Sequence, residues 1–577
     1  MPPRKSTAAS AAETNGRTPR KASRAKTASQ KVEEEEVIAK TNGVEDHTKM
    51  DVDESQPAAE EKPPTQPKRG AKRAAAPDAE VEPTTVKRAR ARVSRVNGTS
   101  HAASTTILNP LPGIPAKMRP SQHMFIFGNG EMGQLGLGVD VLDEIGRPKL
   151  HTWFQEAIED GKLGGEGAGI EKACTGGMHT LAVDELGRIW SWGVNDNASL
   201  GRPTSNVPNP DVPGEFYQTE VMETQPMLVQ SLVDEGFRTV TIAAGDSISV
   251  ALDADGHLRC WGSFRSSDGL LGFDGKLGSA QRQFVPAPIE DFKKEKFVAV
   301  ACGTDHVLAL TIEGRIWVWG NGQQAQLGRK IIERRKTNAL RPEKLALKKI
   351  VVVGSGSYHS FAVDNRGRVF AWGLNSMKQT GVALEDGGTE DIIITPTEVT
   401  ALSPDNLGGE RVIQISGGEH HTLFLISDGR VYACGRSDGF ELGIGPVEPM
   451  QDADGDEPMS DEDKQSHMRA YVAVPTLISF PPVPTPDEMN PEVPDGPPAI
   501  PPINPISSIH AGTHHNLAVS RAGYIYSWGT GNQSQLGLGS EEEAERPTRL
   551  RYKDGDKWFI RSAGAGGQHC IFLATPK

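Results

Sequence analysis

Histidines are the residues of this 577-residue chain whose type and spacing most readily suggest chemistry. Histidine is the commonest metal ligand and a frequent general acid or base, so a group of them could hold a metal ion or transfer protons. These histidines recur once per sequence repeat, however, which places each in a different structural unit. We therefore expect structural histidines that bond neighbouring backbone, and we predict no metal site, cofactor or catalytic residue. Each stands three residues after a glycine: His179, His306, His359, His421, His515 and His569.

The two positions before each motif histidine carry side chains that the repeat itself does not require. They vary from Gly-Met at 177–178 to Glu-His at 419–420. Since these residues occupy equivalent turns, all of them should be presented on one face of the molecule. Aspartate often caps its own turn, so the residues alone support turn capping and partner binding equally. The unexplained polar side chains are Asp246, Asp305, Glu419, His420 and His514.

Simple sequence patterns exclude several classes of protein. The five cysteines are scattered and form no C-x-x-C pair, which argues against a disulfide framework and a zinc site and favours a reducing compartment. No G-x-x-x-x-G-K-[ST] loop occurs, so nucleotide binding of that kind is not expected. There is no run of about 18 apolar residues, and we predict no membrane span and no membrane partner.

The histidines belong to a unit that is repeated seven times. The first five of these histidines precede a Trp-Gly or equivalent pair by thirteen residues, and a Leu-Gly pair usually follows at a fixed offset. Two short β-favouring runs lie between histidine and tryptophan, joined by a glycine-containing turn, which predicts a β-hairpin. The large tryptophan should pack between neighbouring units. The seven pairs are Phe127-Gly128, Trp192-Gly193, Trp261-Gly262, Trp319-Gly320, Trp372-Gly373, Cys434-Gly435 and Trp528-Gly529.

The ends of the repeated region predict a closed ring. The last unit contains His569 and the run 570–574, and its final strand is missing. Residues 123–128, at the start of the body, resemble that strand. We therefore predict an all-β, seven-bladed β-propeller over residues 121–577, closed by the N-terminal strand completing the C-terminal blade. Residues 446–505, acidic and then Pro-rich, should form a surface insertion loop.

The combination of G-x-x-H, D-x-x-G, W-G and L-G at fixed offsets resembles the regulator of chromosome condensation family, of the fungal type with a long basic N-terminal tail. The resemblance covers nearly all of residues 120–577 and implies a seven-bladed propeller. It also implies that Asp246 and Asp305, with His420 or His421, face the small GTPase Ran. Ile248 replaces one motif histidine, which puts the packing of its unit in question, but not the role of the adjacent Asp246.

The unit of Trp261 departs from the repeat. Its Leu-Gly pair, 271–272, comes two residues late and follows an extra loop around a Ser-Asp-Gly turn. This stretch resembles the wedge-bearing loop of the Ran exchange factor, which family members with other roles need not share. We expect a projecting hairpin that has two leucines near its tip and lies outside the packing that closes the ring. The residues implied in promoting exchange are Ser266, Ser267, Asp268, Gly269, Leu270 and Leu271.

The densest basic run of the acidic body, residues 329–341, follows the Leu-Gly pair 327–328. It aligns with the family loop that contacts the acidic patch of histones, and arginine suits carboxylate clusters through its bidentate fork. A solvated charged loop is the alternative interpretation. The residues assigned to nucleosome and DNA binding are Arg334, Arg335, Lys336 and Arg341.

Residues 1–120 differ in composition from the body. The first 100 residues hold 20 Lys+Arg and 15 Asp+Glu with no aromatic residue, so they cannot bury enough apolar surface to fold. We predict a disordered tail that binds DNA phosphates and carries a bipartite signal for a nuclear import receptor. A solvated charge run is the simpler alternative. The import residues are Lys68, Arg69, Lys72, Arg73, Lys87, Arg88, Arg90 and Arg92.

Together these features predict a nuclear, chromatin-associated guanine-nucleotide exchange factor for Ran that performs no covalent chemistry. It would promote GDP release through the wedge loop and supply Ran-GTP for nucleocytoplasmic transport and mitosis. The main alternative is a propeller scaffold or adaptor, such as a ubiquitin-ligase-associated one, without exchange activity. A third possibility is a photoreceptor resembling the plant ultraviolet receptors, although no tryptophan cluster is singled out in this sequence.

Overall fold

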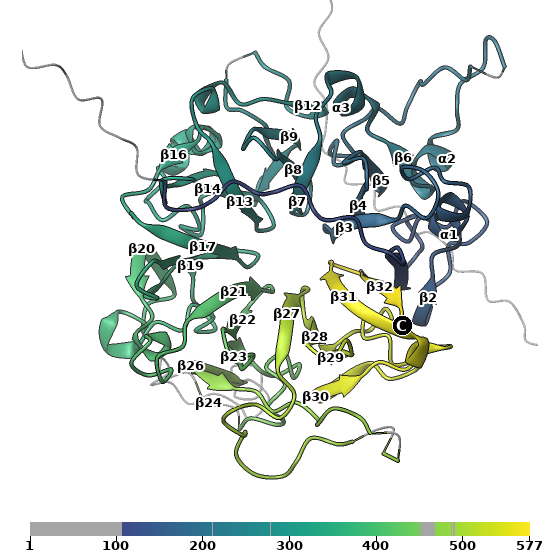
Figure 1. Ribbon diagram of the computed structural model, residues 1–577. Helices are drawn as coiled ribbons and strands as arrows, with labels where there is room; N and C mark the ends of the chain where they lie inside the picture. The colour runs from purple at the N-terminus through teal and green to yellow at the C-terminus, as the bar shows by residue number, and fades with distance from the viewer. Residues whose placement is uncertain are drawn as a thin grey trace, which may run out of the picture. The chain divides into compact units, whose positions relative to one another are not determined.

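The computed structural model describes residues 107–577, except residues 211, 277, 449, 452–467, 486 and 489–490. Seven antiparallel sheets of four strands each surround a central axis (Figure 1), which confirms the predicted propeller. No helix in the described part of the chain is long and apolar enough to cross a membrane. The predicted import signal, from Lys68 to Arg92, lies outside the described residues.

Blade 1 joins the two ends of the propeller, and blades 2 and 3 follow it in the sequence. Strands are given from the axis outwards. Blade 1 contains β31 (Trp558–Ala565), β32 (His569–Pro576), β1 (His123–Gly128) and β2 (Ile145–Leu150). Blade 2 contains β3 (Ile170–Thr175), β4 (His179–Asp184), β5 (Ile189–Gly193) and β6 (Met227–Leu228). Blade 3 contains β7 (Thr239–Ala244), β8 (Ile248–Asp253), β9 (Leu258–Gly262) and β12 (Gln283–Ala287).

Blades 4 to 7 complete the ring. Blade 4 contains β13 (Phe297–Cys302), β14 (His306–Thr311), β15 (Ile316–Gly320) and β16 (Glu343–Lys344). Blade 5 contains β17 (Ile350–Ser355), β18 (His359–Asp364), β19 (Val369–Leu374) and β20 (Ile392–Glu398). Blade 6 contains β21 (Val412–Gly417), β22 (His421–Ile426), β23 (Val431–Arg436) and β26 (Tyr471–Leu477). Blade 7 contains β27 (Ile506–Ala511), β28 (His515–Ser520), β29 (Ile525–Thr530) and β30 (Glu543–Arg549).

The remaining elements lie in the connections between strands. Two hairpins pair β10 (Phe264–Ser266) with β11 (Gly269–Gly272) and β24 (Met450–Gln451) with β25 (Met468–Arg469). The α-helices are α1 (Thr152–Glu159), α2 (Thr219–Thr224) and α3 (Gln230–Glu235). Short 3₁₀ segments are η1 (Glu290–Phe292), η2 (Glu333–Leu340), η3 (Leu384–Asp386), η4 (Thr400–Leu402) and η5 (Gly555–Lys557).

The ring closes as the sequence predicted. Strand β1 pairs antiparallel with β32 over its whole length, from His123 opposite Ala574 to Gly128 opposite His569. The aromatic rings of Phe125 and Phe572 stack across this junction with centroids 4.8 Å apart. The first and last strands are thus held by both a hydrogen-bond ladder and an apolar contact, which leaves no unpaired sheet edge at the seam.

The motif histidines link each blade to the next. Each Nε2 atom lies 2.7–3.0 Å from the side chain that follows the motif position of the neighbouring blade, so the main partners are side chains rather than the expected backbone. Ser360 shows the direction of these hydrogen bonds. Its hydroxyl donates to the Gln326 carbonyl oxygen and therefore accepts from His306 Nε2. Burial lowers the pKa of His306 to about 3, so the ring stays neutral. The pairs are His179–Ser249, His306–Ser360, His359–Thr422, His421–Asn516, His515–Cys570 and His569–Thr180.

The seventh link of this ring is apolar. Ile248 stands at the motif position of blade 3, and the residue that it faces in the order of the ring is Val307 rather than a serine or threonine. Both side chains are fully buried in one cluster. The loss of the histidine is therefore matched by the loss of its polar partner, and the packing of blade 3 is intact.

Part of the predicted insertion 446–505 belongs to the propeller. Strand β26, within this range, pairs with β23 as the outermost strand of blade 6. Ile478 and Phe480, directly after it, are buried in the same core cluster as Trp528. The prediction of a continuous surface loop is wrong here, because completing blade 6 requires a fourth strand and these residues supply it.

An N-terminal segment, residues 107–122, crosses several blades before it enters β1 (Figure 1). We call it the strap. The amide Nδ2 of Asn109 donates to the carbonyl oxygens of Thr311 (3.1 Å) and Ile350 (2.9 Å), in blades 4 and 5. Residues 107–120, which the sequence analysis placed in the tail, therefore lie against the propeller.

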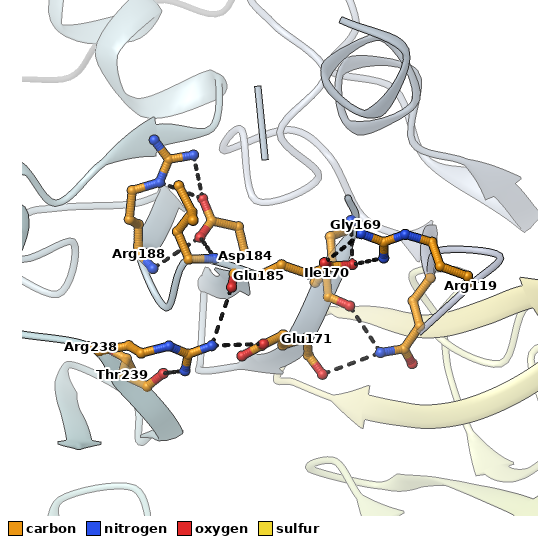
Figure 2. Close-up of polar contacts among 11 residues, drawn as sticks. Arg119, Gly169, Ile170, Glu171, Asp184, Glu185, Arg188, Arg238 and Thr239 are labelled. Carbon is orange, nitrogen blue, oxygen red and sulfur yellow. Dashed lines mark hydrogen bonds and ion pairs between the residues drawn. The ribbon is translucent and has the colours of Figure 1, made fainter. Parts of the chain in front are cut away.

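The other end of the strap is fixed to blade 2 by ionic contacts (Figure 2). Arg119 donates two hydrogen bonds to the Glu185 carboxylate, at 2.6 and 3.0 Å, and Glu185 also accepts from the Gly169 N–H at 3.0 Å. Burial opposes ionisation of Glu185, but the hydrogen bond from Arg119 lowers its pKa overall. Arg238 continues the network by donating to Glu171 (2.9 Å) and to the Glu185 carbonyl (3.2 Å). The strap thus joins blades 2 and 3 to the ring seam.

Candidate protein-interaction face

The turns that precede the motif histidines gather around one end of the central axis. Their glycines, together with Asp246 and Thr304, line a cavity of about 140 Å³. A larger hollow of about 480 Å³ lies beside it, between Asp246 and His514. As predicted, the variable side chains of the repeat are therefore brought to a common face, which we call the turn face.

Asp246 and Asp305 converge on one residue of the extra loop in blade 3. The backbone N–H of Arg265 donates to Asp305 Oδ1 at 2.6 Å, and the guanidinium Nη1 lies 3.9 Å from Asp246 Oδ2. Asp305 is only 8% exposed, whereas Asp246 is half-buried. Burial and then the negative charge of Asp246 raise the pKa of Asp305 to about 7, against the opposing hydrogen bond from Arg265. Asp305 thus anchors the loop, while Asp246 remains open to a partner.

The extra loop is a short hairpin, as expected, but its leucines are not at the tip. Phe264 pairs with Gly272, and the tip is the polar turn at Ser267 and Asp268. Leu271 is 8% exposed and packs in the core cluster of blade 3, while Leu270 is half-buried. The expectation that the loop lies outside the packing of the ring is therefore wrong. We call residues 264–272 the wedge hairpin.

The structure separates the two candidate histidines. His421 is buried, and its Nε2 donates to Asn516 Oδ1 at 2.7 Å, so it belongs to the ring of histidines and not to the turn face. His420 is half-buried and lies 3.9 Å from Glu419. Burial lowers the pKa of His420. Of the two, only His420 is accessible to a protein partner.

An ionic cluster on blades 6 and 7 was only partly visible in the sequence. His514 lies 3.3 Å from Glu419 and 3.7 Å from Glu441, and Arg436 lies 3.4 Å from Glu441. The contacts with Glu419 and then Glu441 raise the pKa of His514 to about 9, so it is positively charged at neutral pH. Glu441 has a sequence signal that we did not use: it stands before a Leu-Gly pair, where most other units have glutamine.

The basic run forms a loop that ends in η2. Arg334, Arg335 and Arg341 are exposed. Lys336 is different, because it forms an ion pair with Asp268 at the tip of the wedge hairpin. Lys336 was grouped with the nucleosome-binding residues, but in the structure it contacts the hairpin.

Within the described residues, Asp253, Asp255 and His257 bring three potential metal ligands together. Asp253 accepts backbone hydrogen bonds from its own turn, and His257 Nε2 lies 2.9 Å from the Lys296 ammonium group. His257 Nδ1 lies 2.9 Å from the Asp253 carboxylate, so the group is a hydrogen-bonded turn rather than a cation site.

The seven four-stranded blades and the histidine ring define a seven-bladed propeller, with the polar turn face at one end of its axis. Residues 123–572 match the family described as the RCC1-like domain. The chain belongs to this regulator of chromosome condensation family.

Comparisons of sequence and of structure both find similar proteins. The chain is 35% identical over 464 residues to the guanine nucleotide exchange factor SRM1 of Saccharomyces cerevisiae, covering 78% of this chain and 86% of that protein. Its fold is similar to the crystal structure of Prp20p from the same organism, described with its binding to Gsp1p and histones (TM-score 0.63, 33% identity, 80% and 93% covered). It is also similar to yeast RCC1 (Prp20) bound by Kap60 (TM-score 0.66, 33% identity, 85% and 97% covered).

Proposed function

We propose that this protein is a guanine-nucleotide exchange factor for the small GTPase Ran. The observation that carries the proposal is the wedge hairpin, which Asp305 anchors beside the open carboxylate of Asp246 on the turn face. A hairpin at this place departs from the repeat and is not needed to complete blade 3, which already has four strands. The sequence identity of 35% to an exchange factor, over 78% of this chain, supports the same activity.

The protein works by binding and not by covalent chemistry. It stabilises the GTPase in a state that holds nucleotide weakly. By linkage, bound nucleotide must weaken the binding of the exchange factor to the GTPase by the same factor. Accelerating release by about 10⁵ requires roughly 7 kcal/mol of stabilisation of the release transition state. The buried leucine and the anchored backbone of the wedge hairpin make it rigid enough to apply such binding energy to the nucleotide site of its partner.

Charged side chains on the turn face select the partner. Asp246 offers a carboxylate, and the positively charged His514 of blade 7 lines the same hollow as Asp246, while His420 lies in the corresponding turn of blade 6. Complementary charge fixes the register of a protein interface and increases the rate of encounter. We assign Asp246, His420 and the wedge hairpin to direct contact with Ran, and Asp305 to anchoring.

Association with chromatin in the nucleus fits a separate part of the chain. Arg334, Arg335 and Arg341 are exposed and suited to the acidic patch of the nucleosome, whose carboxylates they can bind in pairs. The basic N-terminal tail adds a DNA contact and the signal for an import receptor. Ran-GTP produced at chromatin would then drive nucleocytoplasmic transport and mitosis.

A binding experiment tests this function against the scaffold alternative. Purified protein and Ran should elute together from a sizing column when nucleotide is removed by a chelator, and should separate when GDP or GTP with Mg²⁺ is added. A complex that persists in nucleotide, or no complex in its absence, would favour a scaffold and contradict the exchange function.

A further inference from the structure

The wedge hairpin belongs to blade 3, but its support comes from blade 4. Asp305, in the turn between β13 and β14, accepts the hydrogen bond from Arg265 at the base of the hairpin. Two further contacts, from the turn after β15 and from η2, reach the opposite end of the hairpin. The hairpin is thus held at both base and tip by the neighbouring blade.

Gln323 holds the backbone at the tip. Its Oε1 accepts from the Ser267 N–H at 3.0 Å, and its Nε2 donates to the Ser267 hydroxyl at 2.9 Å. The same Nε2 lies 3.3 Å from Glu333 in η2. Because one amide group satisfies both backbone and side chain of Ser267, it fixes the turn in position and orientation.

Lys336 holds the side chain at the tip. Its ammonium group pairs with Asp268 and lies 3.2 Å from Glu333. The Lys336 side chain is 21% exposed, whereas that of Asp268 is 71% exposed. The lysine is therefore already packed in place, and it holds an aspartate that would otherwise extend into solvent.

The segment that carries Lys336 is itself fixed to the hairpin. Leu340, at the end of η2, is 2% exposed and lies in the same core cluster as Phe264 and Leu271. Adding a Cβ atom to Gly275, just after the hairpin, would place it 2.4 Å from the Thr337 carbonyl, so the two backbones are in close contact. Rotation of η2 away from the hairpin would separate Leu340 from Phe264 and Leu271 and expose these apolar side chains.

We propose that Lys336 and Gln323 are positioning residues for nucleotide exchange, which hold the tip of the wedge hairpin in the conformation that enters the GTPase. This inference rests on the exchange function proposed above. A hairpin tip ordered before binding avoids the entropy cost of ordering it in the complex, so the anchors increase the rate of release without touching the GTPase. Lys336 is also committed to Asp268, so of the four basic residues assigned to the nucleosome, the exposed Arg334, Arg335 and Arg341 remain to bind histone carboxylates.

The first test uses the protein alone. Amide hydrogen exchange of the peptide spanning residues 264–273 should become faster in K336A and in Q323A, and K336R should restore the protection of K336A. D268A should have the same effect as K336A, and the double variant should add nothing to it, because one contact is removed in all three. N338A is the matched control: Asn338 is exposed in η2, and no side-chain hydrogen bond of it is found among the described residues.

The second test measures exchange on Ran. K336A and Q323A should lower kcat for GDP release by about fivefold each, the factor expected for one exposed polar contact at the upper end of its range, with KM nearly unchanged. N338A should leave kcat unchanged. Unaltered hydrogen exchange in K336A would overturn the anchoring, and faster hydrogen exchange with unaltered kcat would overturn the positioning role. If the wild-type protein failed to release GDP, the exchange function itself would be wrong, whatever the hydrogen exchange showed.

Discussion

The two adjacent leucines of the wedge hairpin should separate stability from exchange. Leu271 is 8% exposed in the core cluster that contains Phe264 and Leu340, so L271A leaves a partly filled cavity and costs about 2 kcal/mol, the lower end for a buried leucine. The entropy of unfolding of globular proteins is about 2.1 cal/mol/K per residue. For the 450 residues of the propeller family match, 123–572, it is roughly 1 kcal/mol/K. The melting temperature of L271A should therefore fall by about 2 °C.

Leu270 is half-buried and lies in the same strand, where its exposed part is available to a partner. L270A should leave the melting temperature within about 1 °C, since little buried surface is lost. It should nevertheless slow GDP release by about tenfold, because burying the remaining apolar surface in the GTPase contributes about 1.4 kcal/mol.

The assay pairs thermal unfolding by circular dichroism with the release of fluorescent GDP from Ran. L186A provides the control, because Leu186 is 48% exposed in the turn between β4 and β5, at the opposite end of blade 2 from the turn before His179. Equal melting losses in L270A and L271A would refute the division of roles. So would a normal release rate in L270A, which would show that this leucine does not enter the partner.

Three further changes test other parts of the account. As the pH falls through 7, the Asp305 carboxyl takes up a proton and becomes a weaker hydrogen-bond acceptor for the Arg265 N–H. The kcat for exchange should therefore fall by about half at the Asp305 pKa of about 7, and D305N should show no such inflection. An identical pH profile in D305N would exclude Asp305 as the titrating group. R119A should lower the free energy of unfolding, because it leaves the buried Glu185 carboxylate without its ionic partner, and should leave exchange unchanged; urea unfolding identical to wild type would show that this ion pair adds no stability. R334E/R335E should weaken nucleosome binding at least about tenfold in a gel-shift titration with normal release of GDP from Ran, whereas loss of that release would place this loop on the GTPase.

The sequence predicted the ring because six of the seven blades repeat the same hydrogen-bonding requirement. The motif histidine needs a polar partner one residue after the next motif position, and this spacing fixes the register of neighbouring blades. Where the repeat is broken, at Ile248, the partner Val307 changes with it, and a search for paired substitutions could have found this. Strand β26 was missed because Pro475 interrupts a short run after an acidic segment, although proline is compatible with an outermost strand.

The site was predicted less completely, because its contacts join residues of different blades. Lys336 and Asp268 are separated by 68 positions, and no local pattern reports their pairing. Leu271 was assigned to the tip because a loop that departs from the repeat gives no direct sign of which side chains turn inward. His421 could have been excluded from the sequence, since it occupies the motif position that the scaffold uses in other blades.

The most direct test of the central claim is the rate at which the protein releases fluorescent GDP from Ran in the presence of excess GTP. Catalytic amounts of wild-type protein should accelerate release by several orders of magnitude, up to about 10⁵ at saturation. D246A/D305A should melt within a few degrees of wild type and bind nucleosomes normally, yet lose most of this acceleration, because it lacks both the open carboxylate and the hairpin anchor. Release at the intrinsic rate with the wild-type protein, or undiminished acceleration by the folded double variant, would contradict the account.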